Sequence, residues 1–252
     1  MTGGLEAIIF DFDGVIADSE RLHLRAFQDV LAPHGLTLSD DAYLSTYLGY
    51  DDRGLLKKYA QVEGLGWDAA RLDELAAAKM VRYDALTAQG ELLFPGAAAF
   101  IRAAAGAVPI AIASGALTHE IDEVLENAGL RNCFVAVVGA DQTERSKPSP
   151  DPYLEAFHRI VTAGHAVDPS RTVAIEDSRW GLVSADTAKL RLVAVATTYR
   201  ASELAPFAEL VVAGLHDLTL DDLDALCRST PARLRERRPS GEADLGGKPV
   251  ES

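Results

Sequence analysis

The sequence predicts an α/β fold in which a parallel sheet carries helices on both faces and a small all-helical domain is inserted after the first strand. Two observations predict it. From about residue 94 onward, short β-prone apolar runs alternate with helical patterns, which is typical of right-handed crossovers between parallel strands. Between about residues 19 and 91, apolar residues instead recur at helical spacing, and no convincing buried strand is present.

The first strand is the apolar run that ends at Phe10, where Asp11, Asp13 and Gly14 follow. A short continuous apolar run is typical of a strand buried on both faces. Ligands bind just beyond the carboxyl ends of such strands, and buried carboxylates there need a cation or a reacting group. We therefore expect Asp11 and Asp13 to mark a metal-dependent site, with Gly14 allowing a sharp turn that brings backbone carbonyls to it.

The inserted segment contains several short helical patterns, which Pro33, Gly35 and the polar loop 49–53 separate. We assign residues 18–91 to a helical domain, and residues 1–17 and 92–228 to the core domain.

In the core domain, the apolar runs predict further strands at 108–113, 134–138, 172–175 and 192–196, with a last one at 210–212. Helical patterns lie at 117–128, 152–161 and 182–189, with a last helix at 220–226. Residues 229–252 mix proline, glycine and charge with few apolar side chains, so they cannot offset their ordering entropy. We expect this tail to be disordered and its arginine-rich stretch 233–238 to be solvated.

Composition limits the partners. A net charge of −14 argues against nucleic acid and anionic membranes. The two cysteines cannot form a disulfide framework, and neither a signal peptide nor a membrane span is evident. We expect a cytoplasmic protein, monomeric rather than oligomeric, that acts on a small molecule.

Chemistry-bearing residues follow four of the predicted strands, where one crevice would collect them. They are Asp11 and Asp13, then Ser114 and Gly115, then Lys147 in the loop after the third core strand, and finally Glu176-Asp177-Ser178. Each group alone has a structural explanation, as a turn, a helix cap or a solvated loop. Their occurrence together at strand ends favours a shared site.

The combination suits phosphoryl transfer, which needs in-line geometry and neutralisation of the transferred oxygens. A carboxylate can act as the nucleophile and form an aspartyl-phosphate. Mg²⁺ prefers carboxylates and carbonyls, so Asp11, a backbone carbonyl of Asp13, and Asp177 would suit it. Lys147 offers a point positive charge to the phosphate, and Ser114 offers a hydroxyl together with backbone amides that include Gly115.

These motifs, in this order, resemble those of the haloacid dehalogenase superfamily over about residues 5–226. The inserted helices resemble the small C1 cap of its β-phosphoglucomutase-like, CbbY-like branch. The resemblance implies a Rossmannoid core of the haloacid dehalogenase type and Mg²⁺ as the cofactor. Its implied site residues are Asp11 as nucleophile, Asp13 as general acid and base, Ser114 and Lys147 as phosphate binders, Asp177 as a metal ligand, and Glu176 as a ligand or its immediate support.

The resemblance extends to three cap residues. His23 stands where a histidine of this branch couples cap closure to acid–base work. Arg53 resembles a cap arginine that holds a substrate's distal phosphate, and Lys79 resembles a cap lysine near the active site of some members. The alternative is that all three are ordinary helix-surface residues.

Three departures from the family pattern narrow the reaction. Asp13 stands where dehalogenases carry a non-acid and phosphonate-cleaving members carry alanine, which argues against cleavage of carbon–halogen and carbon–phosphorus bonds. The residues after Ser114 lack the Lys-Asn pair of well-known β-phosphoglucomutases. Close relatives often end the helix after the fourth motif in Ala-Gly-Met, whereas this chain has Lys189-Leu190-Arg191, which we expect to affect only the end of that helix.

The leading hypothesis is a Mg²⁺-dependent phosphatase that hydrolyses a small phosphorylated metabolite, a sugar phosphate, through an aspartyl-phosphate. One alternative is a sugar phosphomutase of the β-phosphoglucomutase type, which returns the phosphoryl group to a sugar and excludes water by cap closure. Another is a non-catalytic protein that only binds sugar phosphates.

Overall fold

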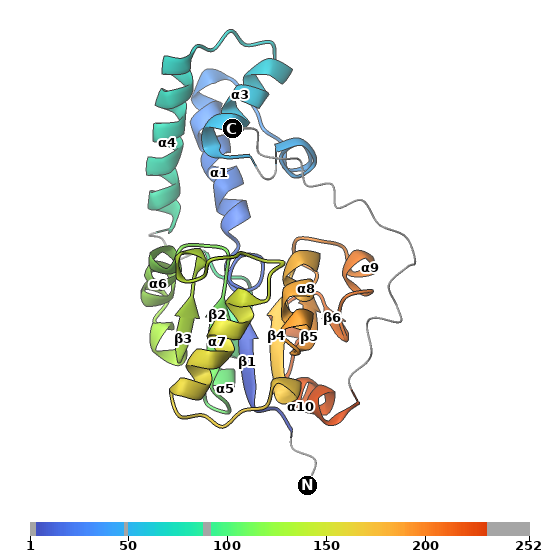
Figure 1. Ribbon diagram of the computed structural model, residues 1–252. Helices are drawn as coiled ribbons and strands as arrows, with labels where there is room; N and C mark the ends of the chain where they lie inside the picture. The colour runs from blue at the N-terminus through green and yellow to red at the C-terminus, as the bar shows by residue number, and fades with distance from the viewer. Residues whose placement is uncertain (1–3, 48–49, 88–91, 231–252) are drawn as a thin grey trace.

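The computed structural model describes residues 4–47, 50–87 and 92–230. It consists of a sheet with helices on both faces and a helical part that stands over the carboxyl ends of the strands (Figure 1). The predicted α/β class with an inserted helical cap is therefore confirmed.

The core is a six-stranded parallel sheet in the order β3-β2-β1-β4-β5-β6. Its strands are β1 (Ala7–Phe10), β2 (Ile110–Ala113), β3 (Ala136–Val138), β4 (Thr172–Glu176), β5 (Arg191–Val195) and β6 (Leu210–Val212). The order reverses between β1 and β4, so the loops that follow these two strands diverge. A crevice at such a switch point is the usual ligand site of an open α/β sheet.

Helices cover both faces of this sheet. One layer contains α5 (Ala97–Ala105), α6 (Thr118–Asn127) and α10 (Leu220–Arg228), and the other contains α7 (Asp151–Thr162), α8 (Arg179–Thr187) and α9 (Ala201–Leu204). The period of two along each strand divides the side chains between the layers. In β1, Ile8 and Phe10 pack toward the first layer, while Ala7 and Ile9 pack toward the second.

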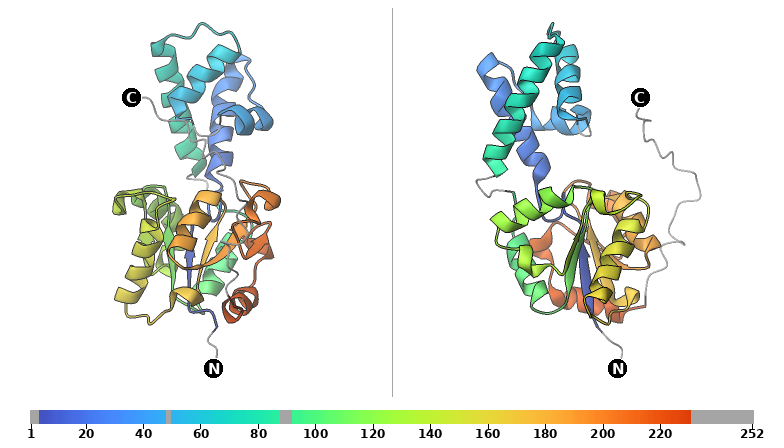
Figure 2. Two further views of the ribbon diagram at one scale, coloured as in Figure 1. Left: turned by 45° about the vertical axis from the view of Figure 1, so that its right-hand side comes forward. Right: turned by 60° about the vertical axis from the view of Figure 1, so that its left-hand side comes forward.

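The cap comprises α1 (Ser19–Leu31), α2 (Asp40–Ala42), a π-helical turn over Tyr43–Tyr47, α3 (Asp52–Val62) and α4 (Ala69–Thr87). It has a separate apolar core, in which Phe27, Leu56 and Tyr59 are buried. The two connections to the sheet pair with each other, since Phe94 N donates to the carbonyl of Ile16 at 3.0 Å. The turned views show α1 and α4 rising side by side from the core (Figure 2). We retain 18–91 as the proposed cap domain.

Several predicted boundaries differ from the observed ones. Helix α5 was not predicted, although its buried residues recur at helical spacing, and α9, with four residues, is too short to show a helical period. Helix α8 begins at Arg179 and ends at Thr187, and Lys189 adopts a left-handed conformation with φ 69°. The predicted disordered tail lies outside the described residues from 231 onward. Within the described part of the chain, no helix has the length and apolar character needed to cross a membrane.

Candidate active site

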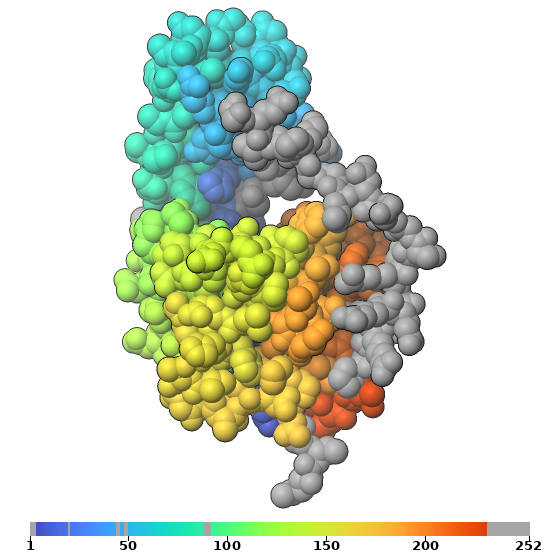
Figure 3. Space-filling model, viewed as in Figure 1, coloured from blue at the N-terminus to red at the C-terminus, as the bar shows by residue number. Residues whose placement is uncertain are grey.

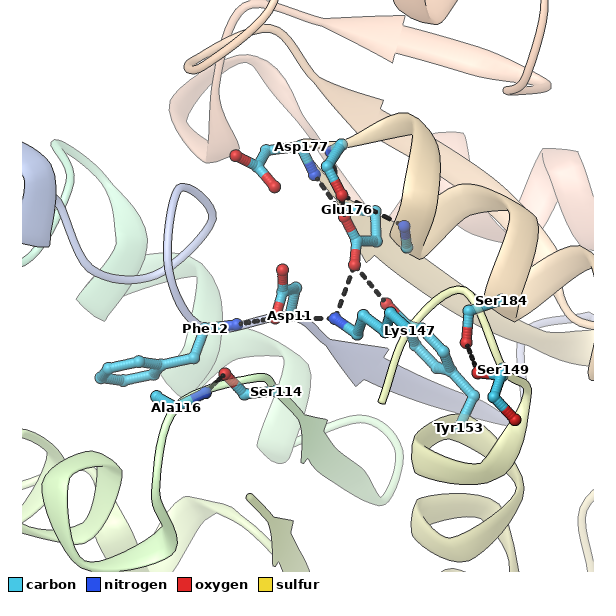
Figure 4. Close-up of polar contacts among 12 residues, drawn as sticks. Asp11, Phe12, Ser114, Ala116, Lys147, Ser149, Tyr153, Glu176, Asp177 and Ser184 are labelled. Carbon is cyan, nitrogen blue, oxygen red and sulfur yellow. Dashed lines mark hydrogen bonds and ion pairs between the residues drawn. The ribbon is translucent and has the colours of Figure 1, made fainter. Parts of the chain in front are cut away.

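Asp11 lies at the centre of the candidate site, directly after β1 (Figure 4). Its backbone N–H donates to the carbonyl of Ile175 at 2.9 Å, so pairing with β4 fixes its position. Its Oδ1 accepts from Phe12 N at 2.7 Å and lies 2.8 Å from Lys147 Nζ. The side chain is buried, and both of these donors lie on one oxygen.

Lys147 links the β1 and β4 ends of the site. Its Nζ lies 2.8 Å from Asp11 Oδ1 and 2.6 Å from Glu176 Oε1. The loop that carries it is anchored to α8, because the Ser184 hydroxyl donates to the carbonyl of Ser149. Burial opposes the charge of Lys147, but the two carboxylates outweigh burial and hold the pKa of the ammonium above its usual range. Lys147 is therefore a fixed positive charge.

Glu176, the last residue of β4, is fully buried. Its Oε1 accepts from Lys147 Nζ and from the Tyr153 hydroxyl at 3.2 Å. Its Oε2 accepts from the N–H groups of Asp177 and Ser178, both at 3.0 Å. Burial opposes ionisation, but Lys147 and these donors lower the pKa of Glu176. Because both oxygens are engaged by the protein, the geometry favours the supporting role over direct metal ligation.

Asp177 completes a cluster of three buried carboxylates. One oxygen each of Asp11, Glu176 and Asp177 lie within 4.8 Å of one another. Burial raises the pKa of Asp177 to about 7, with Glu176 adding to the effect. Burial, followed by the charge of Glu176, also raises the pKa of Asp11 well above its usual value. Lys147 alone does not balance this charge.

This cluster fits a divalent cation. Hard oxygen donors held close together in a buried position are the ligands that Mg²⁺ prefers. Burial, and then repulsion from Glu176, raise the pKa values of Asp11 and Asp177, and a cation there would oppose both effects.

Gly14 is required beside this cluster. Its φ is +75°, and a Cβ built on it would lie 2.0 Å from Asp177 Oδ2. The Thr197 hydroxyl donates to the Gly14 carbonyl and fixes the turn. The predicted sharp turn is therefore present, and it also leaves room for the Asp177 carboxylate.

Asp13 lies apart from the carboxylate cluster and faces the cap. Its Oδ1 accepts from the Ser19 hydroxyl at 2.7 Å, and Ser19 is the first residue of α1. Burial raises the pKa of Asp13, and the charge of Glu120 adds to this effect, while Ser19 and Lys147 oppose it. Asp13 is thus the carboxyl group linked directly to the cap.

Ser114 and Gly115 follow β2, next to β1 in the sheet. Ser114 is buried, its N–H donates to the carbonyl of Val138 at 2.9 Å, and its hydroxyl accepts from Ala116 N at 3.0 Å. Gly115 is exposed and lines a cleft. Figure 4 shows Ser114 beside Asp11, on the opposite side from Glu176.

The cleft lies between the cap and α6, and Asp13, Ser19, His23 and Gly115 are among its lining residues. Its volume is about 520 Å³, which falls within the range of roughly 300–1,000 Å³ of small-molecule sites. On the left of Figure 3, the cap meets the core at α4 and α6, two of the helices that contribute residues to this cleft. The right-hand view of Figure 2 shows the lower ends of α1 and α4 over α6.

His23 and Lys79 meet above this cleft. Lys79 is 2% exposed, and its Nζ lies 2.6 Å from His23 Nδ1 and 2.7 Å from Asp52 Oδ1. The His23 ring stacks on Tyr83 with centroids 4.2 Å apart. Burial, and then the charge of Lys79, lower the pKa of His23 to about 4. Since an ammonium only donates, His23 Nδ1 is the acceptor and Nε2 carries the proton.

Arg53 is not brought to the cleft. It pairs with Asp73 at 2.6 Å, and it is absent from the described residues that line the cleft. Asp73 precedes Lys79 by six residues on α4, which places it about 9 Å farther from the core end of that helix. The neighbouring Asp52 contacts Lys79 instead, because consecutive helical residues point about 100° apart. The expected contact of Arg53 with a distal phosphate therefore has no support from this arrangement.

The structure adds residues that the sequence did not single out. The Ser19 hydroxyl reaches Asp13, and Tyr153 reaches Glu176 while its ring lies 5.0 Å from Lys147 Nζ. A side-chain hydrogen bond from Thr198 opposes the raised pKa of Asp177. Tyr153 lies in a helical apolar pattern, so it resembled an ordinary core residue. Thr198 lies beyond β5, where no motif marked it.

Comparison with known proteins places the chain in a family. Residues 5–188 match the model of the haloacid dehalogenase-like hydrolases. The chain belongs to this family. The expected membership, and the expectation that the chain is an enzyme, are thereby confirmed. The motifs that carried the resemblance supply Asp11 and Asp13, Ser114, Lys147, and Glu176 with Asp177.

Individual relatives cover most of the chain. Protein CbbY of Rhodobacter capsulatus is 33% identical, and the match covers 77% of this chain and 87% of that protein. Hexitol phosphatase B of Escherichia coli K12 is 30% identical, with 86% and 96% covered. A crystal structure of a CbbY mutant from Rhodobacter sphaeroides in complex with xylulose-(1,5)bisphosphate is 28% identical, with a TM-score of 0.64 and 87% and 99% covered.

Proposed function

We propose that this protein is a Mg²⁺-dependent phosphatase that hydrolyses a small phosphorylated metabolite, a sugar phosphate, through an aspartyl-phosphate. The observation that carries the proposal is the placement of Asp11. Its carboxylate lies 2.8 Å from the Lys147 ammonium and clusters with the buried Asp177, and the next two residues, Phe12 and Asp13, line a cleft of small-molecule size. Membership of the haloacid dehalogenase-like hydrolases supports the reaction class.

In the first step, an Asp11 oxygen attacks phosphorus and the ester P–O bond breaks. Phe12 and Lys147 both bond Oδ1, which leaves Oδ2 to make the new bond. Asp13 gives its proton to the departing alcohol oxygen. Its raised pKa supports this role, because burial favours the protonated acid before the substrate reacts. Lys147 and Ser114 would stabilise the transferred oxygens.

In the second step, Asp13 takes a proton from water as that water attacks phosphorus. The bond from phosphorus to Asp11 breaks, and inorganic phosphate and the Asp11 carboxylate are released. Ser19 holds Asp13 at the start of α1, so the position of the cap and the position of the acid are linked.

Mg²⁺, when bound, would supply positive charge to the phosphate oxygens. Asp11, Asp177 and the backbone carbonyl of Asp13 would hold it, and Glu176 would support it through Lys147 and the Asp177 N–H.

The names of the relatives support a sugar-phosphate substrate class. One relative is a hexitol phosphatase, and one neighbouring structure contains a sugar bisphosphate. Together they leave the number of phosphate groups on the substrate open.

The test is release of inorganic phosphate from a panel of phosphorylated metabolites, with and without Mg²⁺, including both anomers of glucose 1-phosphate. Asp11→Asn should abolish Mg²⁺-dependent turnover, whereas Asp221→Asn, an exposed change on α10, should leave it unaltered. Full turnover by Asp11→Asn rules out the mechanism. An isomerised sugar phosphate with little free phosphate indicates the mutase instead, and Mg²⁺ binding without turnover of any ester indicates a binding protein.

A further inference from the structure

The walls of the cleft carry negative charge. Besides Asp13, its described lining residues include the carboxylates of Asp84, Glu120 and Glu123, and they include no lysine or arginine. Asp84 lies near the end of α4, while Glu120 and Glu123 lie on α6. The cap and the core therefore both present acidic groups to the space next to Asp13.

Among the described residues of the cap, no lysine or arginine lines the cleft. Lys79 is buried and bonds Asp52 and His23, so its ammonium is already engaged. Arg53 is paired with Asp73 outside the cleft. Lys147 brings a positive charge to the reacting end of the site, where its ammonium lies between Asp11 and Glu176.

The carboxylates at the mouth are available to a ligand. Asp84 and Glu123 form no ion pair or hydrogen bond with the described residues. Glu120 uses Oε2 to accept from Leu117 N at 3.1 Å, and it lines the same cleft as Asp13. The carboxylates of Asp84, Glu120 and Glu123 therefore line the same cleft as the proposed acid, Asp13. A carboxylate accepts hydrogen bonds, so it matches a hydroxyl or amine donor and repels a phosphate.

We propose that the cleft selects phosphomonoesters whose far end is uncharged and rich in hydroxyl groups, and that Asp84, Glu120 and Glu123 reject a second phosphate there. The proposal rests on the phosphatase function above and names its substrate class. By this proposal, the chain prefers sugar monophosphates and differs in selectivity from an enzyme that acts on a sugar bisphosphate.

Binding can test this selectivity without turnover. Isothermal titration calorimetry on the Asp11→Asn protein with Mg²⁺ held at constant free concentration would compare fructose 1-phosphate with fructose 1,6-bisphosphate. The bisphosphate carries a second phosphoryl group at C6, where the monophosphate has a hydroxyl group. We expect at least about tenfold tighter binding of the monophosphate, because like charges placed together are strongly disfavoured. Added salt screens the exposed carboxylates, so it should reduce the ratio of monophosphate affinity to bisphosphate affinity.

A charge-reversing substitution of a carboxylate that lines the cleft provides a second test of the selectivity. Glu123→Lys should improve bisphosphate binding several-fold relative to monophosphate binding. Asp221→Lys makes the same change in net charge on α10, outside the cleft, and should leave the ratio unaltered.

The outcomes separate the two proposals. Bisphosphate binding as tight as that of the monophosphate, no binding of either ligand, or equal effects of Glu123→Lys and Asp221→Lys would overturn the selectivity. Absence of phosphate release from every ester by the unmodified protein would instead overturn the phosphatase function.

Discussion

Replacing Gly14 by alanine should weaken binding of a divalent cation, because the added Cβ takes the space of a carboxylate. That Cβ would lie 2.0 Å from Asp177 Oδ2 and 2.9 Å from Thr198 Oγ1, whereas ordinary van der Waals contact begins at 3.4 Å. Asp177 would have to retreat by about 1.4 Å, more than the near-ideal octahedral geometry of Mg²⁺ tolerates. We expect at least a tenfold loss of Mg²⁺ affinity, equivalent to about 1.4 kcal/mol.

Gly35→Ala is a matched control for backbone strain. Gly35 has φ +72°, close to the +75° of Gly14, but no atom lies within 4 Å of the Cβ that would be added. Both variants should lose about 1 kcal/mol of unfolding free energy from the left-handed conformation. The displacement of Asp177 is specific to Gly14→Ala.

Calorimetric titration with Mg²⁺ measures the affinity, and urea unfolding without Mg²⁺ measures the strain. The expected result is weakened Mg²⁺ binding in Gly14→Ala and unaltered binding in Gly35→Ala. If both variants bind Mg²⁺ as the parent protein does, Asp177 is not a metal ligand in the position described.

Three further predictions follow from buried charge and backbone strain. Lys147→Met removes the ammonium between Asp11 and Glu176, so unfolding free energy at neutral pH should fall by about 3 kcal/mol. The lowered pKa of Glu176 reflects stabilisation that is present above its usual pKa and lost as pH falls through the lowered value. The loss of unfolding free energy in Lys147→Met, measured by urea unfolding against the parent protein, should therefore become smaller as pH falls. A loss that does not change with pH would contradict the ion pair between Lys147 and Glu176. Lys189→Gly removes the left-handed strain at the end of α8, so the protein should gain about 0.5–1 kcal/mol; an unaltered melting temperature would count against this. Lys79→Met should raise the pKa of His23 from about 4 toward its usual value, as followed by NMR of the ring protons, because a neighbouring positive charge is lost. A His pKa lowered by folding makes stability fall as pH drops from the usual value to the lowered one, so this acid sensitivity should weaken in the variant. An unmoved His23 titration would show that burial alone sets that pKa.

Much of the fold was predictable because each strand carries its own signal. The buried runs around Ile9, Ile112 and Ala174 are continuous and apolar, since helices cover both faces of the sheet. Helix α5 was not predicted, although its buried residues Ala97, Phe100, Ile101 and Ala104 stand at helical spacing, because only two of them are large apolar residues that mark this spacing in the sequence. The end of α8 was anticipated as unusual at Lys189, but the positive φ at that residue comes from the structure.

The candidate site was predictable to the extent that strand ends meet at one edge of a parallel sheet. Asp11, Ser114, Lys147 and Glu176 are far apart in the chain, yet each follows or ends a strand, or lies in a loop at that edge. The cap was different. Arg53 and Asp52 are adjacent in the sequence, and the packing of α3 against α4 decides which one contacts Lys79.

The sequence alone therefore determined the α/β class, the edge of the sheet where the candidate site lies and the residue types collected there. Local patterns encode these features, because strand periodicity and strand-end position are properties of short segments. Only the tertiary structure decided that both carboxylate oxygens of Glu176 accept hydrogen bonds from the protein, that the Ser19 hydroxyl donates to Asp13, and that carboxylates line the cleft. Those features depend on side chains from separate segments meeting at hydrogen-bond distance, and that is decided by how the cap, the loops and the helices pack.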